Sequence, residues 1–267
     1  MIEIRNLTGQ SWETLTNAFN EAFSDYDIPA RYTVQYVEQL VTRRGYRADL
    51  ALGAFDGERL VGFVFNCLDG DRAYNSGTGV VPSHRRQGIA RELMQRSIAN
   101  APAREYVLEV IETNTRAIAL YRSLDFEERR RFQCWTYEAP KREKITELAN
   151  VDYEALLAWA DFEPSWQNAP ASLRRTNEPH CVLGNEDCAA VLVTSSGDVP
   201  LLAVRPEARR RGLGARLLNA CATRANRPLR IINIDDRAEG VTAFLEAAGA
   251  KRFARQIEMK RLLVVGD

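Results

Sequence analysis

A short basic segment, Arg85-Arg86-Gln87-Gly88-Ile89-Ala90, has residue types and spacing that suit the binding of a phosphate group. It lies between a predicted strand and a predicted helix. The first N–H groups of a helix have no partners within it and carry the positive end of the helix dipole, so an anion such as a pyrophosphate is favoured there. Gly88 lets the backbone approach that anion because it has no side chain. A solvated basic loop that merely starts a helix is the plain alternative.

A second copy of the segment favours the phosphate-binding interpretation. Arg209-Arg210-Arg211-Gly212-Leu213-Gly214 also follows a strand pattern and precedes an amphipathic helix pattern. Gly88 and Gly212 are 124 residues apart. The same offset relates Val80 to Val204, Pro82 to Pro206, Leu120 to Phe244 and Phe126 to Ala250. This period is too long for a solenoid repeat and indicates two domains of one fold. We predict an N-terminal domain over residues 1–140 and a C-terminal domain over residues 141–267.

The elements that must position the two loops follow from hydrophobic periodicity and turn residues. Residues 50–55 and 60–65 predict a hairpin with Asp56 and Gly57 at its turn. Residues 76–81 predict a strand that stops at Pro82, which cannot donate to a ladder. The next predicted elements are a helix over 88–99, a buried strand over 106–111, a helix over 115–124 and a last strand over 132–137. The second half repeats this order, so the expected fold class is mixed α/β.

Two other phosphate-binding patterns fit less well. A Walker loop needs Lys-Ser or Lys-Thr after its last glycine, and neither copy has it. A dinucleotide fingerprint needs a third glycine, where the second copy has Leu217. Glu109 follows the first loop by about 20 residues, but it lies near the start of its strand, whereas a ribose-binding acid belongs at the end. A nucleotide-binding oxidoreductase is therefore disfavoured.

The pattern Arg/Gln-x-x-Gly-x-Gly/Ala between a strand and a helix resembles the acetyl-CoA motif of the GNAT acetyltransferase superfamily. Asn114, Ala117, Leu120, Tyr121, Leu124 and Phe126 resemble a later motif of the family, with Asp125 at its usual glycine. The resemblance implies tandem domains, each with a mixed, mostly antiparallel sheet between helices. It also implies that two parallel strands splay apart around the pantetheine arm. The residues that it assigns to acetyl-CoA are Gly79, Val80, Val81, Arg85, Arg86, Gln87, Gly88, Ile89, Ala90 and Asn114, with Ala203, Val204, Arg209, Arg210, Arg211, Gly212, Leu213 and Gly214 in the second domain.

Tyr121 stands where the family places the group that protonates the leaving thiolate, and a phenol of pKa about 10 can donate that proton. A half-buried helix aromatic packed on the sheet is the plain alternative for this residue. The offset of 124 places Leu245 opposite Tyr121 and Ala238 opposite Asn114. The second domain is therefore expected to be the weaker catalyst, and binding of the cofactor by its loop is left open. 

Glu109 and Glu112 flank the strand ahead of Asn114, where a carboxylate could accept a proton from the acceptor ammonium through water. A hydrogen-bonded network for one carboxylate and solvent for the other is the alternative. The region of Asp25, Tyr26 and Asp27 covers the acceptor site in the family, so these residues are expected to hold a cationic substrate. A turn composed of Asp and Pro needs no such role. Residues 163–168 are the corresponding aromatic and polar stretch of the second domain.

The composition limits the class of protein. Basic and acidic residues number 36 each, which argues against a nucleic-acid-binding surface. Five cysteines without Cys-x-x-Cys spacing and two histidines give no ordinary zinc site, so no metal is expected. These cysteines predict reduced thiols in the cytoplasm. No apolar run reaches the roughly 20 residues of a membrane span, and no secretory signal stands at the N-terminus.

We therefore expect an acetyl-CoA-dependent N-acetyltransferase whose first domain transfers the acetyl group directly to a primary amine. The acceptor is left open between a polyamine, an aminoglycoside, an amino acid and a protein N-terminus, and a homodimer is one open assembly. The alternative is that the second domain, or the whole chain, is a non-catalytic CoA-binding or interaction module.

Overall fold

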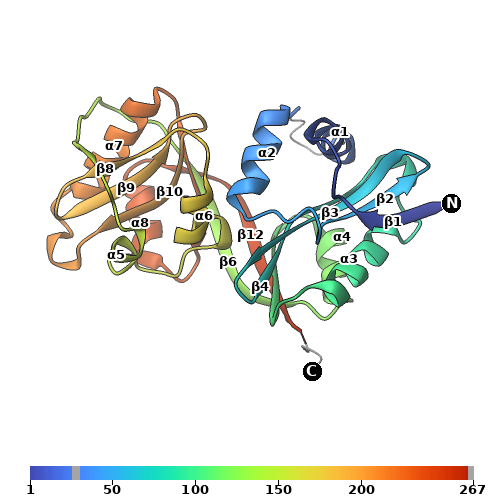
Figure 1. Cartoon of the computed structure of the whole chain (residues 1–267). Coiled ribbons are helices and arrows are strands. Elements are labelled where there is room, and N and C mark those ends of the chain that lie inside the picture. The colour runs from blue at the N-terminus through green and yellow to red at the C-terminus, as the bar shows by residue number, and fades with distance from the viewer. Residues whose placement is uncertain (26–30, 264–267) are drawn as a thin grey trace.

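The computed structural model describes residues 1–25 and 31–263, which form two lobes of strands and helices (Figure 1). The elements of the first half are β1 (Ile2–Asn6), α1 (Trp12–Ala22), α2 (Val34–Arg43), β2 (Leu52–Asp56), β3 (Arg59–Asp69), β4 (Arg72–Val80), η1 (Pro82–His84), α3 (Ile89–Asn100), β5 (Glu105–Ile111), α4 (Thr115–Arg122) and β6 (Glu127–Tyr137). Those of the second half are β7 (Glu147–Leu148), α5 (Tyr153–Leu157), η2 (Trp166–Asn168), α6 (Pro170–Arg175), β8 (His180–Gly184), β9 (Cys188–Val193), β10 (Asp198–Val204), η3 (Pro206–Ala208), α7 (Leu213–Ala225), β11 (Leu229–Asp235), α8 (Glu239–Ala247) and β12 (Lys251–Leu262).

The strands of both halves join in one twelve-stranded sheet, in the order β1-β2-β3-β4-β5-β12-β6-β11-β10-β9-β8-β7. The pairs β4–β5 and β10–β11 are parallel, and the other neighbours are antiparallel. The predicted fold class, a mixed and mostly antiparallel sheet flanked by helices in two similar halves, is confirmed.

The two halves exchange their last strands. β6 pairs with β11 of the second half, in a register that runs from Leu229↔Tyr137 to Asp235↔Phe132. β12 returns to the first half and pairs with β5, and it also pairs with β6. Both strands cross the middle of the molecule in Figure 1. The domain boundary near residue 140 stays a prediction about the sequence. In space, each lobe contains a strand from the other half.

Helices cover both faces of the sheet. In the first lobe α3 and α4 pack on one face and α1 and α2 on the other. In the second lobe α7 and α8 cover one face, and α5 and α6 the other. The predicted inner face of α3 is buried at Ile89, Leu93 and Met94. The helix predicted over 115–124 ends at Arg122, and Asp125 just beyond it has a φ of 60°, which turns the chain into β6.

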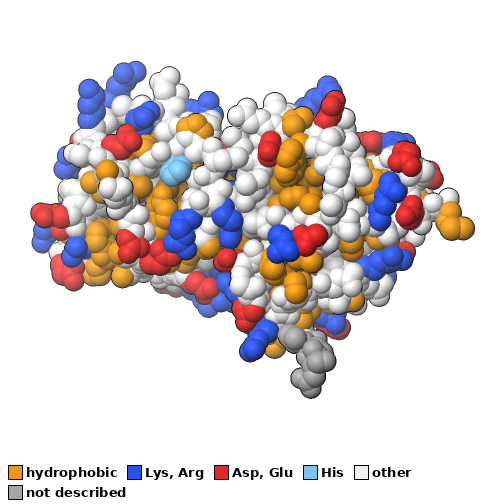
Figure 2. Space-filling view, in the orientation of Figure 1, with side chains coloured by type: hydrophobic (Ala, Val, Ile, Leu, Met, Phe, Trp, Pro, Cys, Tyr) orange, Lys and Arg blue, Asp and Glu red, His pale blue; other side chains and the backbone are white. Residues whose placement is uncertain are grey.

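Charged side chains of both signs are interspersed on the face shown in Figure 2, in keeping with their equal totals. All five cysteines are buried and carry free thiols. Within residues 1–25 and 31–263, no helix combines the length and the apolar character that crossing a bilayer requires.

Candidate functional site

The parallel strands β4 and β5 separate halfway along their length. They pair from Arg72↔Glu105 to Asn75↔Leu108, and no later pair joins them within the described residues. The Asn75 side chain supports the separation, because its Oδ1 accepts the Gly77 N–H at 2.9 Å and this donor then needs no partner on β5. The result is a gap between residues 76–80 and 109–111. We call it the strand gap; it matches the splayed strands that the sequence resemblance implies.

The predicted phosphate loop leads from β4 to α3 at the outer end of the strand gap. Gly88 is the N-cap of α3, with a φ of 80°, and it supplies no side-chain cap. A Cβ placed on Gly88 would meet no described atom within 4 Å, so the space beside the backbone is open. Arg86 also has a positive φ of 63°. This pair of turns, with open space over the first amides of a helix, fits a pyrophosphate group.

Arg85 has a structural position rather than an exposed one. Its guanidinium donates to the Val80 and Ala22 carbonyl oxygens, at 3.1 and 2.8 Å, and forms an ion pair of 2.5 Å with Asp25. The guanidinium lowers the pKa of the Asp25 carboxyl. Asp25, expected to hold the acceptor, thus fastens the loop to the end of α1. Tyr26 and Asp27 lie outside the described residues.

The second loop repeats this geometry closely. Arg209 donates to the Val204 and Trp159 carbonyl oxygens, at 3.1 and 2.8 Å, and pairs with Asp161 at 2.7 Å. The next residues repeat the backbone turns, with φ of 62° at Arg210 and 79° at Gly212. The space beside Gly212 is open, as it is beside Gly88. The remaining loop residues, Gln87, Arg86, Arg210 and Arg211, are exposed.

The end of β4 is closely packed behind the loop. A Cβ on Gly79 would lie 2.6 Å from the Phe63 ring and 2.9 Å from Ala22 Cβ, so only glycine fits. Val81 is fully buried, and Val80 packs on the core beneath α3. In the second half Ala203 takes the place of Gly79 and is also buried.

Tyr121 and Asn114 lie at the two ends of α4. Tyr121 is 7% exposed and packs in the core that the sheet forms with α3 and α4. Its ring centre lies 5.9 Å from that of Phe126. The Asn114 side chain caps α4 by accepting the Ala117 N–H at 3.1 Å. The second half keeps the buried position as Leu245, but Ala238 supplies no side-chain cap to α8.

Glu109 on β5 and Glu112, just beyond the end of that strand, have different surroundings. Glu112 pairs with Arg131 at 2.7 Å and with Arg255 at 3.6 Å on the surface. Glu109 keeps some exposed surface as a residue, yet its Oε1 is inaccessible to solvent and makes no hydrogen bond of good geometry with any described residue.

The carboxylate of Glu109 lies against the second half. Its Oε2 accepts the Nδ2 of Asn233 at 2.7 Å and the Nε2 of Gln167 at 2.9 Å. Burial raises the pKa of Glu109, while the Arg44 guanidinium, the Asn233 amide and the nearby Tyr74 hydroxyl lower it by stabilising the charged form. Gln167 and Asn233 were not predicted as site residues. The offset of 124 is a signal that could have found Asn233, because it pairs position 233 with position 109.

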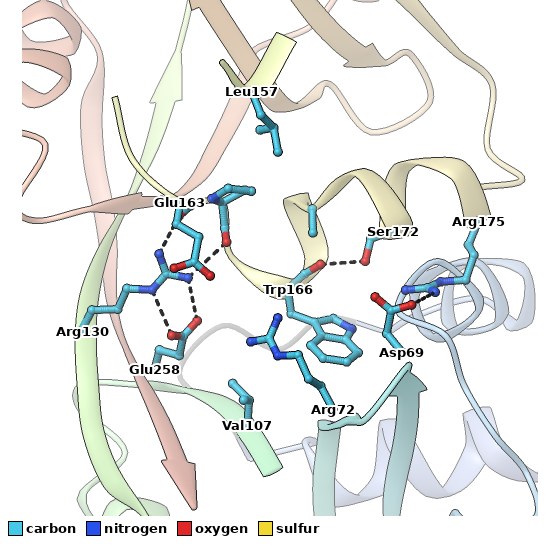
Figure 3. A pocket seen from close by; sticks show the side chains of 12 residues that line it. Asp69, Arg72, Val107, Arg130, Leu157, Glu163, Trp166, Ser172, Arg175 and Glu258 are labelled. Atoms are coloured by element: carbon cyan, nitrogen blue, oxygen red, sulfur yellow. Dashed lines mark hydrogen bonds and ion pairs between the residues drawn. The ribbon is translucent and has the colours of Figure 1, made fainter. Parts of the chain in front are cut away.

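A pocket with a cavity volume of about 160 Å³ lies between the two halves. Its charged groups are paired: Arg130 forms a two-pronged ion pair with Glu258, and Arg175 pairs with Asp69 (Figure 3). Trp166 forms part of its wall and stacks on Tyr74 at 4.9 Å between ring centres. The described residues contain no group of three or more His, Cys, Asp or Glu that could hold a metal ion.

Comparisons with known proteins agree with this geometry. Residues 12–126 match the model of the acetyltransferase (GNAT) family. A putative acetyltransferase from Pyrococcus horikoshii is 15% identical, with a TM-score of 0.76 over 99% of this chain and 90% of its own. A GCN5-related N-acetyltransferase from Sphaerobacter thermophilus is 17% identical, with a TM-score of 0.68 over 100% of this chain and 97% of its own.

A tandem GNAT protein from the clavulanic acid biosynthesis pathway is 14% identical and covers 100% of both chains, with a TM-score of 0.70. No curated protein matches the sequence. At these identities the solved structures show the fold. The family match and the shared fold together identify the N-terminal half as a GNAT acetyltransferase domain, in a chain that has the tandem GNAT fold throughout.

Proposed function

We propose that this protein transfers the acetyl group of acetyl-CoA directly to a primary amine, and that the reaction takes place in the strand gap of the first half. The observation that carries the proposal is the placement of three features around one gap. The phosphate loop at Gly88 lies at its outer end, Tyr121 packs on one face of β5, and the Glu109 carboxylate lies on the other. This arrangement fits acetyl-CoA that is bound through its phosphates, with its thioester between a proton donor and a proton acceptor.

The residues have distinct roles in this proposal. The backbone amides of 86–90 bind the pyrophosphate, and residues 79–81 lie along the pantetheine arm. Glu109 accepts a proton from the acceptor ammonium, directly or through water, so that the neutral amine can attack the acetyl carbonyl carbon. The C–N bond forms as the C–S bond breaks, and the Tyr121 hydroxyl gives its proton to the departing thiolate. The nitrogen then loses its second proton to solvent, and solvent returns a proton to Tyr121. The products are an N-acetyl amine and CoA.

The second half retains the loop backbone but has different residues at the reacting positions. Leu245 replaces the proton donor, Asn233 replaces the carboxylate and Ala238 replaces the helix cap. An amide and an alkyl chain cannot exchange protons with an amine and a thiolate at neutral pH. We infer that the second half is a non-catalytic member of the pair, in which the loop at Gly212 keeps the backbone turn and open space that suit CoA. The five free thiols suit the reducing cytoplasm, where we place the protein.

The test is thiol release from acetyl-CoA by the full chain with a panel of amines, accompanied by mass spectrometry of the amine products. The panel contains polyamines, aminoglycosides, amino acids and peptides with free N-termini. We expect acetylation of at least one class, and we expect Glu109→Gln to abolish most of it at neutral pH. An intact chain that binds acetyl-CoA but acetylates no amine would favour the second candidate, a CoA-binding module. The residues at the reacting positions of the second half already favour the role of a CoA-binding module for that half.

A further inference from the structure

Two amides of the second half touch the carboxylate that the proposed reaction needs in the first. The Nδ2 of Asn233 and the Nε2 of Gln167 both donate to Oε2 of Glu109, at 2.7 and 2.9 Å. Asn233 is fully buried and Gln167 is 6% exposed, so water does not compete for these contacts. The second oxygen of Glu109 is left without a hydrogen bond of good geometry to any described residue.

The orientation of both amides is fixed by their other partners. The Oε1 of Gln167 accepts the Arg44 guanidinium at 2.6 Å, and arginine can only donate, so the Gln167 NH₂ group must face Glu109. The Oδ1 of Asn233 lies 3.7 Å from the Cys134 thiol, while its NH₂ group also donates to the Ser165 hydroxyl at 3.0 Å. Asn233 adopts a φ of 62°, a conformation that asparagine tolerates better than most residues.

The same contacts bridge the strand gap. Arg44 donates to the backbone oxygen and the hydroxyl of Ser76, both at 3.1 Å, on the part of β4 that has left β5. A continuous chain of hydrogen bonds therefore runs from Ser76 on β4 through Arg44 and Gln167 to Glu109 on β5. The Trp166 ring beside Gln167 stacks on Tyr74, where the two strands are still paired. Gln167 is thus held at the point where the strands part.

We propose that Gln167 and Asn233 are positioning residues for acetyl transfer: the second half fixes the Glu109 carboxylate through Oε2 and so holds it in the orientation in which it accepts the proton of the acceptor amine. This proposal rests on the proposed function of the first half. It gives the second half a part in the chemistry without a reaction of its own. Binding through one oxygen restrains the carboxylate, and preorganised groups lower the cost of orienting reactants.

The first test measures the Glu109 carboxylate itself, without acceptor or acetyl-CoA. Carbon-13 NMR of the full chain labelled at glutamate carboxyls gives its titration, assigned by the signal lost in Glu109→Gln. Asn233→Gly removes the amide while suiting the positive φ, and Gln167→Ala removes the other. Each loses a hydrogen bond to the charged form, so each should raise the Glu109 midpoint by about one pH unit. The charged and titratable groups facing Glu109, namely Arg44, Glu258 and Tyr74, are retained in every variant.

Asn219→Ala is the matched control. Asn219 is a buried amide of the same half, 4% exposed, and it accepts the Tyr137 hydroxyl at 2.9 Å. Its loss should destabilise the fold as the loss of the other buried amides does, and leave the Glu109 midpoint unchanged. If Asn233→Gly does not fold, Gln167→Ala alone still decides the matter. A midpoint that stays at the wild-type value in every folded variant overturns the proposal.

The second test is the pH profile of acetyl transfer to the amine found by the panel. The acid limb of kcat/KM should move upward in Gln167→Ala and Asn233→Gly, with activity recovering at alkaline pH, where Glu109 is ionised in all variants. An equal loss at every pH would mean a merely structural role and would refute the positioning. If Glu109→Gln keeps full activity, the role of Glu109 in the proposed function fails instead, whatever the NMR titration shows.

Discussion

Phe132 and Gln256 face each other in the β6–β12 ladder, although they are 124 residues apart and hold equivalent positions in the two halves. Because the strands are antiparallel, a local two-fold axis must pass between the two residues. The pairs on either side, Arg131↔Ile257 and Gln133↔Arg255, keep this register. Glu109 and Asn233 are another equivalent pair, and they meet at 2.7 Å beside the same axis. The repeat seen in the sequence is thus a spatial symmetry whose two central strands have changed places.

The strand exchange predicts that the halves do not fold separately. A fragment of residues 1–140 would lack β12 and expose the edge of β5, and a fragment of residues 141–267 would lack β6 beside β11. We expect each fragment alone to be aggregated or largely unfolded by circular dichroism and gel filtration, and co-expression to yield a soluble 1:1 complex. The full chain should unfold in one calorimetric transition. A monomeric, cooperatively folded 1–140 fragment would contradict this.

Tyr121→Phe should reduce turnover while leaving the affinity for acetyl-CoA nearly unchanged. The substitution keeps the ring that packs on Phe126 and removes only the proton donor. General acid catalysis contributes about 100- to 10,000-fold, so kcat should fall by that order. Leu245→Ala is the counterpart in the second half and should instead destabilise the fold by about 2–5 kcal/mol, because it deletes buried methyl groups. Full turnover by Tyr121→Phe, measured where the chemical step limits the rate, would remove Tyr121 from the mechanism.

Gly88→Glu and Gly212→Glu form a matched pair that separates the two loops. Both glycines have a φ near 80° and open space beside them, so the backbone strain of substitution should be similar. Gly88→Glu sets a negative charge beside the pyrophosphate, and we expect at least tenfold weaker acetyl-CoA binding in the first half, or about 1.4 kcal/mol. Gly212→Glu should leave turnover intact. Calorimetric titration and steady-state rates on the full chain measure both, and equal losses in the two variants would argue against the assignment.

Glu109→Gln should stabilise the folded protein at neutral pH while it impairs transfer. Burial raises the pKa of Glu109 above its value in the unfolded chain. The folded state therefore holds more protons than the unfolded state between those two values, and the free energy of unfolding falls as the pH rises through that window. Glutamine removes this cost and keeps the shape. For a chain of this size, a gain of about 1 kcal/mol raises Tm by roughly 2–4 °C.

Scanning calorimetry of the wild type and of Glu109→Gln at pH 7.5 and pH 4.5 checks the sign. The advantage of the variant should shrink as the pH falls from 7.5 towards 4.5, because the wild-type carboxyl takes up a proton in the folded state as the pH falls through its raised pKa, and the cost of burying its charge is then lost. A variant that is less stable than the wild type at pH 7.5 would show that the ionised carboxylate contributes more through its hydrogen bonds than its burial costs.

The sequence was sufficient to predict the local elements and the paired loops. Gly88 and Gly212 each stand at a strand-to-helix turn, and such turns depend on a few adjacent residues. The exchange of β6 and β12 could not be predicted in this way. The two strands occupy equivalent positions in the repeat, and each meets a similar neighbour in either lobe. Local patterns show that a strand exists, but not which copy of the sheet it completes.

The surroundings of the site residues also depended on contacts between distant parts of the chain. The sequence places Arg85 in a basic segment that suits a phosphate, and the fold ties its guanidinium to Asp25, 60 residues before it. The sequence alone leaves Glu109 open between a proton acceptor, a member of a hydrogen-bonded network and a solvated carboxylate. Its partners Gln167 and Asn233 come from the other half, 58 and 124 residues away. Only the three-dimensional fold brings these groups together.

The exchanged strands have one more consequence. When two identical chains trade an element, the product is a swapped dimer that dissociates on dilution, since its formation is bimolecular. Here both halves belong to one chain, so the strand exchange is intramolecular and its extent does not depend on protein concentration. The two partners also need not be identical. One half can lose its proton donor and still be retained, because the other half depends on its strand and its side chains and not on a second catalytic site.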